Sequence, residues 1–228
     1  MVIPLHDDNP TTTRPYVTAG ILIVCVLAYL LAGDSKDTFG LVPAVLSGQE
    51  ILPPGSAAIP AWATAFTYMF MHGGFWHLAG NMLFLWIFGN NIEEAMGHAR
   101  FFVFYVACGL AAAFSQVLPN PGSIVPIVGA SGAISGVLGA YLLLFPRARV
   151  LLGLPLGFVN VEFGRFPAIW VLTTWFALQL LFVGIAATRA GGESQGGIVF
   201  GAHIAGFIAG LALVTIFKRR HVPLWRRY

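Results

Sequence analysis

The stretch Gly129-Ala130-Ser131-Gly132 opens an apolar run that ends near Phe145. Glycine disfavours a helix and leaves the backbone open to close approach, so a hydroxyl between glycines is an unusual start for a passive membrane-spanning helix. Ser131 is therefore the first candidate for a reactive group in this chain.

The composition around this stretch is that of a membrane protein. Hydrophobic residues make up 57% of the 228 residues and charged residues 9%, and the mean hydropathy is +0.80. So little polar surface does not cover a soluble protein of this size. Apolar runs long enough to cross a bilayer fall at residues 16–32, 75–92, 101–118, 131–145, 167–188 and 198–217.

Backbone that spans a membrane must satisfy its own hydrogen bonds, so all six runs are expected to be helical. The sequence thus predicts an all-α, polytopic membrane protein with six transmembrane helices. One bundle would occupy residues 16–217, between an N-terminal cytoplasmic tail at 1–15 and a basic cytoplasmic tail at 218–228.

Basic residues give this arrangement an orientation. Lys36 and Arg189 lie on one side of the six-span model, and the rest of the 12 Lys and Arg lie on the other. The positive-inside rule then places both termini in the cytoplasm, with the basic tail beside anionic lipid. We expect a multi-pass protein of the cell inner (plasma) membrane. The pI near 9.1 does not indicate nucleic-acid binding, since there is no soluble domain to carry it.

Polar side chains at membrane depth are costly and are candidates for function by default. His72, His77 and Asn81 come at the start of the second span, Ser131 at the start of the fourth and His203 at the start of the sixth. These spans all run from outside to inside, so the five side chains are expected at similar depth in the outer part of the bundle.

Pairs of glycines indicate how two of these groups meet. Ser131 and His203 are each followed by two glycines four residues apart, which are Gly132 and Gly136, and Gly206 and Gly210. Small residues at this spacing let helix backbones pack closely. The fourth and sixth spans are therefore expected to cross there, with Ser131 and His203 within hydrogen-bonding reach.

A Ser beside a His is an activated nucleophile, because the imidazole takes the hydroxyl proton during attack and returns it to the leaving group. No Asp or Glu lies in the outer half of the spans to orient His203, so the sequence predicts a dyad. His77 and Asn81 share one helix face and can donate to an oxyanion together with the Ser131 amide. His72, five residues before His77, can support the site from the rim.

Three motifs lie on alternate spans: His72-x4-His77-x3-Asn81, the Gly129–Gly132 stretch, and Ala202-His203-Ile204-Ala205-Gly206-Phe207-Ile208-Ala209-Gly210. In order and in placement they resemble the rhomboid intramembrane serine proteases. The resemblance covers about residues 16–217 and is to the basic six-helix bacterial form.

The resemblance implies that Ser131 is the nucleophile and His203 the general base. It implies an oxyanion hole made of His77, Asn81 and the Ser131 amide, with Gly129 lining the approach and His72 as an accessory residue.

The resemblance also has implications outside the dyad. It gives Glu93 a structural role, embeds loop 33–67 partly in the membrane, and makes the fifth span with loop 189–197 a gate for the substrate helix. One departure is Ser135, which stands where some members carry an aromatic residue that packs on the catalytic His.

These inferences predict a serine endopeptidase that cleaves transmembrane segments of single-pass membrane proteins near the outer face of the bilayer, through an acyl-enzyme. No metal, no other cofactor and no nucleic acid is expected. Two alternatives stay open. One is a rhomboid-like protein that binds membrane proteins without cleaving them. The other is a six-span transporter in which His72, His77 and His203 form a proton or metal path, and in which Ser131→Ala would leave function intact.

Overall fold

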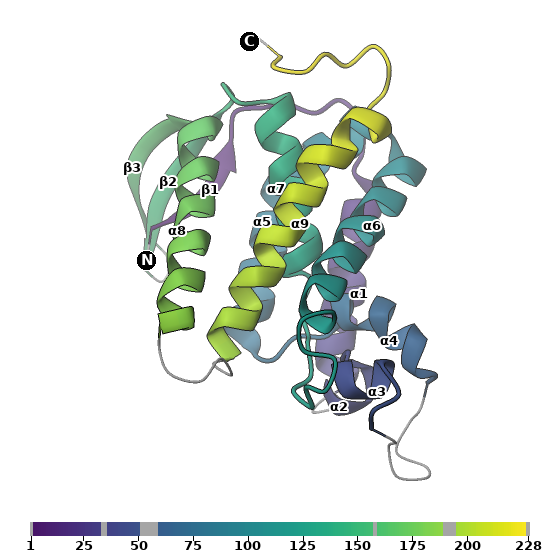
Figure 1. The fold of residues 1–228 in the computed structure, drawn as a ribbon. Helices are drawn as coiled ribbons and strands as arrows, with labels where there is room; N and C mark the ends of the chain where they lie inside the picture. The colour runs from purple at the N-terminus through teal and green to yellow at the C-terminus, as the bar shows by residue number, and fades with distance from the viewer. Residues whose placement is uncertain (1, 33–35, 51–58, 157–158, 189–194, 227–228) are drawn as a thin grey trace.

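The computed structural model describes residues 2–32, 36–50, 59–156, 159–188 and 195–226 (Figure 1). Long helices form its body, and their positions confirm the helical segments expected from the apolar runs. They are α1 (Tyr16–Ala32), α5 (Phe75–Met96), α6 (His98–Val117), α7 (Ser131–Leu144), α8 (Ala168–Thr188) and α9 (Gln195–Phe217).

Length and composition make several of these helices suitable for a membrane. Among the described residues, α6, residues 168–185 of α8 and residues 200–217 of α9 are long and apolar enough to cross one. Residues 16–31 of α1 and the whole of α7 form shorter apolar helices. The chain is therefore a membrane protein, while the number of six spans stays a prediction.

Helix α7 lies at the centre of the bundle, and every residue from 132 to 141 is buried. Its glycines allow this position, because they let α9 approach to backbone contact. A Cβ atom added to Gly206 would lie 2.0 Å from the carbonyl oxygen of Gly132, and one added to Gly210 would lie 2.0 Å from that of Gly136. The predicted packing of these two helices on their glycine pairs is thus confirmed. The hydrogen bond expected between Ser131 and His203 is not formed, since Nε2 of His203 has no partner among the described residues.

The prediction of an all-α fold is wrong in one respect, since a three-stranded antiparallel sheet lies at one end of the bundle (Figure 1). Its order is β1 (Ile3–Asp7), β2 (Arg149–Leu156) and β3 (Val159–Pro167). In its register, Ile3 lies opposite Gly153, and Arg149 lies opposite Pro167.

The physical reason for this difference is the period with which apolar residues recur between α7 and α8. In β3, Val161 and Phe163 alternate with Glu162 and Gly164, which is the two-residue period of a strand. The segment is too short and too polar to cross a bilayer, so a search for long apolar runs leaves it as a connection.

Both terminal segments close this end of the molecule. Residues 3–7, part of the segment predicted as a tail, are held in the sheet by β2. The segment after α9 returns across the ends of α5 and α7, where the Arg219 amide donates to the Ala95 carbonyl at 2.9 Å and the Trp225 amide donates to the Leu143 carbonyl at 2.9 Å.

Short helices cover the opposite end: α2 (Lys36–Phe39), α3 (Pro43–Leu46), α4 (Ala61–Thr67) and the 3-10 helix η1 (Tyr68–Phe70). Leu41 and Ile127 exchange two backbone hydrogen bonds, of 3.0 and 2.8 Å, and the Gly129 amide donates to the Tyr68 carbonyl at 2.9 Å. The first loop therefore holds the segment that leads into Ser131. Its embedding in the membrane stays a prediction, and residues 33–35 and 51–58 lie outside the described residues.

Glu93 joins the start of α1 to the end of α5. Its carboxylate is 1% exposed and accepts hydrogen bonds from the amides of Val17 and Thr18 at 2.8 and 2.7 Å, and from the Thr18 hydroxyl at 2.6 Å. The first amides of a helix have no acceptor within it, so Glu93 supplies one to α1. His98 Nδ1 lies 2.6 Å from the same carboxylate. These contacts confirm the structural role expected of Glu93.

Candidate active site

A cavity of about 250 Å³ holds four of the side chains singled out in the sequence. Its walls come from α5, α7, α8 and α9, and Ser131, His203, His77 and Asn81 all line it. Segments up to 126 residues apart in the chain, from His77 to His203, thus meet in one place. The rest of the wall is largely apolar.

Ser131 is the first residue of α7. The opening amides of a helix have no acceptor within it, and such groups are ready donors to a negative charge. The Ser131 carbonyl points along α7, as carbonyls in a helix do, and it accepts a hydrogen bond of 2.6 Å from the Ser135 hydroxyl. The polar groups of Ser131 that remain for the cavity are its hydroxyl and its amide.

Gly129 lets the ring of His77 approach this hydroxyl. The φ of Gly129 is +125°, which L side chains rarely adopt, and an added Cβ would lie 2.8 Å from Nε2 of His77 and 3.6 Å from Oγ of Ser131. The absence of a side chain at this position thus makes room for His77 beside the nucleophile candidate. The expectation that Gly129 lines the approach has a steric basis.

Hydrogen bonds define the orientation of His77. The Gly73 amide donates to Nδ1 of His77 at 3.4 Å, so the ring proton lies on Nε2, which is on the side of the ring that faces Gly129. An Nε2–H group in this place is a suitable donor to an oxyanion on a substrate held by Ser131.

His72 lies behind His77 and does not line the cavity. Its ring is 5% exposed and packs edge to face on the His77 ring, with centroids 5.2 Å apart. The Phe70 carbonyl can only accept, so Nδ1 of His72 donates to it over 3.2 Å. This position agrees with an accessory role, acting through the orientation of His77.

Asn81 follows His77 by one helical turn and faces the same cavity. The residue is 8% exposed, and its Nδ2 group has no hydrogen-bond partner among the described residues. A buried donor of this kind is costly unless something accepts from it, so Asn81 is a second candidate for contact with an oxyanion.

His203 is held from the neighbouring helix α8, by a residue that the sequence analysis missed. Its Nδ1 atom lies 2.9 Å from Oε1 of Gln179, which is 8% exposed. The dyad was predicted because no carboxylate lies in the outer half of the spans, whereas Gln179 is an uncharged amide. Two signals could have found it: a polar side chain inside an apolar span is costly, and Gln179 follows Leu172 by seven residues, on the same buried face.

Aromatic packing on His203 also comes from α8. The ring centroid of Trp175 lies 6.0 Å from that of His203, and 6.1 Å from that of Phe207. Ser135 cannot supply the aromatic contact that some rhomboids have at this position. The structure provides it from the α8 side of the cavity instead.

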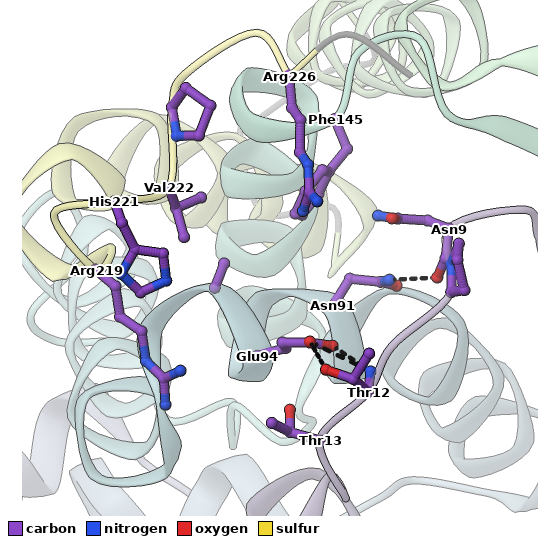
Figure 2. Close-up of a pocket in the computed structure, with 13 residues that line it drawn as sticks. Asn9, Thr12, Thr13, Asn91, Glu94, Phe145, Arg219, His221, Val222 and Arg226 are labelled. Atoms are coloured by element: carbon purple, nitrogen blue, oxygen red, sulfur yellow. Dashed lines mark hydrogen bonds between the residues drawn. The ribbon is translucent and has the colours of Figure 1, made fainter.

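A second cavity, of about 380 Å³, lies at the other end of the bundle (Figure 2). Within it, the amide and hydroxyl of Thr12 donate to the Glu94 carboxylate, the latter at 2.6 Å, and Nδ2 of Asn91 donates to the Asn9 carbonyl at 2.7 Å. These bonds fasten the N-terminal segment to α5. The polar residues of this cavity therefore have a structural role, although its volume exceeds that of the cavity at Ser131.

Comparisons with known proteins agree with the fold and the site. The family profile described as Rhomboid domain matches residues 60–220. The chain is 32% identical to Rhomboid protease GluP of Bacillus subtilis over 137 residues, which are 60% of this chain and 25% of that protein. It is 25% identical to Rhomboid protease GlpG of Salmonella choleraesuis over 203 residues, covering 88% of this chain and 62% of that protein.

A third relative is Rhomboid protein 1, mitochondrial, of Saccharomyces cerevisiae, which is 42% identical over 87 residues, or 36% of this chain. The matched region spans 25% of that protein, so the chain corresponds to a part of these longer relatives. The profile covers well over half of the chain and contains every residue of the cavity. The chain belongs to the rhomboid family.

Proposed function

We propose that this protein is an intramembrane serine endopeptidase with Ser131 as nucleophile and His203 as general base. The observation that carries the proposal is the shared cavity, in which Ser131, His203, His77 and Asn81 meet from three helices. The names of the two relatives called rhomboid proteases, GluP and GlpG, support the same activity.

In the proposed reaction, Oγ of Ser131 attacks the carbonyl carbon of a peptide bond while His203 takes the hydroxyl proton. The oxyanion accepts hydrogen bonds from Nε2 of His77, Nδ2 of Asn81 and the Ser131 amide. His203 then returns the proton to the leaving nitrogen as the C–N bond breaks, which leaves an acyl-enzyme. Water then attacks the ester while His203 takes its proton, the bond between the carbonyl carbon and Oγ breaks, and His203 returns the proton to Oγ of Ser131 as the carboxylic acid leaves. Each oxyanion donor contributes about 10² to 10³ in rate in such sites.

The proposed substrates are single-pass membrane proteins cleaved within or beside their transmembrane segment. The basic residues support six spans with both termini in the cytoplasm, so that the cavity opens toward the outer face of the cell inner membrane. In this arrangement α8 and residues 189–197 form the gate. Residues 189–194 lie outside the described residues, and residues 195–197, expected in the loop, are the first residues of α9.

A fluorophosphonate probe, which reacts with activated serines, tests the proposal on protein purified in detergent. We expect labelling of the wild type, and none of Ser131→Ala or His203→Ala. Ser135→Ala is the matched control, because Ser135 lines the same cavity one turn later and its hydroxyl is bound to the Ser131 carbonyl. It should label like the wild type.

Labelling that persists in Ser131→Ala would overturn the assignment of the nucleophile. A folded wild type that stays unlabelled would favour the non-cleaving binder, and the transporter would be favoured if ion flux survived Ser131→Ala. Thermal unfolding of each variant shows whether it is folded.

A further inference from the structure

The hydrogen bond between α8 and the ring of His203 bears on the proposed chemistry. An imidazole acts as a base toward Ser131 only if the nitrogen facing the hydroxyl carries a lone pair. A neutral ring has one proton on one of its two nitrogens, and the partner of the other nitrogen decides which tautomer is present. The contact of Nδ1 with Gln179 is therefore part of the reaction geometry.

We propose that Gln179 is a positioning residue that holds the proton of His203 on Nδ1 and so presents Nε2, with its lone pair, to Ser131. The inference rests on the proposed function, because it assigns a cause to the basicity of one member of the dyad. It replaces the expected unassisted dyad by a Ser–His pair with an amide as the orienting third group.

The contacts support this assignment in three ways. An amide oxygen can only accept, so Oε1 of Gln179 at 2.9 Å from Nδ1 requires the proton on Nδ1. Nε2 of His203 is buried and has no hydrogen-bond partner among the described residues, while the residue itself lines the cavity that holds Ser131. Trp175, one turn before Gln179, packs on the ring and limits its rotation.

Burial makes the loss of this hydrogen bond costly. Gln179 is 8% exposed in a helix whose neighbouring positions are largely exposed, with Leu178 at 43% and Leu180 at 50%. An amide inside an apolar bundle is costly without a partner, so Gln179 and His203 satisfy one another. An uncharged acceptor orients the ring without the desolvation cost of a buried carboxylate.

Two variants and one control separate orientation from packing. Gln179→Met keeps the length of the side chain and removes the acceptor, and we expect the rate of fluorophosphonate labelling at Ser131 to fall about tenfold, the scale of one hydrogen bond. Gln179→Glu restores an acceptor at the same place and should recover most of the rate. Leu180→Met, on the lipid side of the same helix, should label like the wild type.

A spectroscopic measurement gives a readout that packing alone does not change. Nitrogen-15 chemical shifts of the histidine ring report which nitrogen carries the proton, and the His203 signals are assigned by their loss in His203→Ala. We expect protonated Nδ1 in the wild type and in Gln179→Glu, and a mixture of tautomers in Gln179→Met.

A proton on Nε2 of His203 in the wild type would overturn the inference. This measurement tests the inference even if Gln179→Met fails to fold. Labelling of Gln179→Met at the wild-type rate would overturn it too. So would a Gln179→Glu protein that labels as slowly as Gln179→Met while its His203 tautomer is unchanged. Failure of the proposed function looks different: the wild type would not label, or Ser131→Ala would, whatever the tautomer of His203.

Discussion

Replacing Gly206 by Ala tests whether the contact between α7 and α9 sets the site. The new Cβ would lie 2.0 Å from the Gly132 carbonyl oxygen, where ordinary contact begins at 3.4 Å. The obstacle is backbone, which has no rotamer that relieves the clash. The two helices must therefore separate by roughly 1.4 Å at a point one residue from Ser131 and three from His203.

Two effects of this separation can be estimated. Overpacking of a well-packed interior costs about 1–3 kcal/mol of folding free energy. A misplacement of about 1 Å between reacting groups costs on the order of 10² in rate. We expect Gly206→Ala to unfold at a lower temperature than the wild type and to label with a fluorophosphonate about a hundredfold more slowly.

Two matched substitutions separate stability from geometry. Gly210→Ala makes a clash with the same shortest distance, 2.0 Å from the Gly136 carbonyl oxygen, and comes closer to the Gly136 C and Cα atoms, at 2.6 Å, but it lies one turn farther from His203. It should lose at least as much stability and less activity. In α1, an added Cβ on Gly20 meets nothing within 4 Å, so Gly20→Ala should be neutral or slightly stabilising. A Gly206→Ala protein with the wild-type labelling rate and unfolding temperature would refute the reasoning.

Three further predictions concern single positions. Gly129→Ala should reduce labelling by about 10², since its Cβ would lie 2.8 Å from Nε2 of His77, and unfolding curves should show that the fold remains; an active variant would contradict the assignment of His77. Glu93→Ala should lower the free energy of unfolding by about 3 kcal/mol or more, as buried amides of α1 lose their acceptor, whereas Glu93→Gln keeps an oxygen and should cost less; equal unfolding of both in detergent would argue against this. Burial raises the pKa of Asp7 to about 6 from 3.8, despite the hydrogen bond that it accepts from Tyr141. The folded protein therefore holds this proton more tightly, so stability is full below about pH 4 and falls as pH rises through about 6, by up to about 3 kcal/mol. Thermal unfolding between those limits should show the fall in the wild type and a flatter profile in Asp7→Asn.

The meeting of Ser131, His203, His77 and Asn81 in one cavity was predictable from the sequence, because polar residues stand out in apolar spans. Ser131 and His203 precede glycine pairs, and backbone contact of those glycines brings their helices together in the structure. His77 and Asn81 share a helix face by their spacing alone. Gln179 was not found, because a neutral amide was not considered as a partner for His203, and the role of α8 depends on a contact between distant parts of the chain.

The fold was less predictable outside the long helices. The pairing of β1 with β2 joins residue 3 to residue 153, and nothing local in a five-residue segment specifies that partner. The short helices of the first loop are also fixed by distant contacts, such as the exchange of backbone hydrogen bonds between Leu41 and Ile127. Long periodic segments carry their own signal, whereas short segments take their structure from the surfaces they meet.

The backbone contact between α7 and α9 has a consequence for the response of this protein to its lipids. Helices adjust to a thinner or thicker bilayer mainly by tilting. Two helices whose backbones touch at Gly132 and Gly206 tilt as one body, so the separation of Ser131 and His203 does not follow acyl-chain length. Helix α8 contacts α9 through side chains such as Trp175 and Phe176, which can shift without a clash of backbones, so α8 can tilt more easily than α7 and α9. We therefore expect hydrophobic mismatch to change how readily a substrate enters, while the spacing of the two reacting groups stays constant.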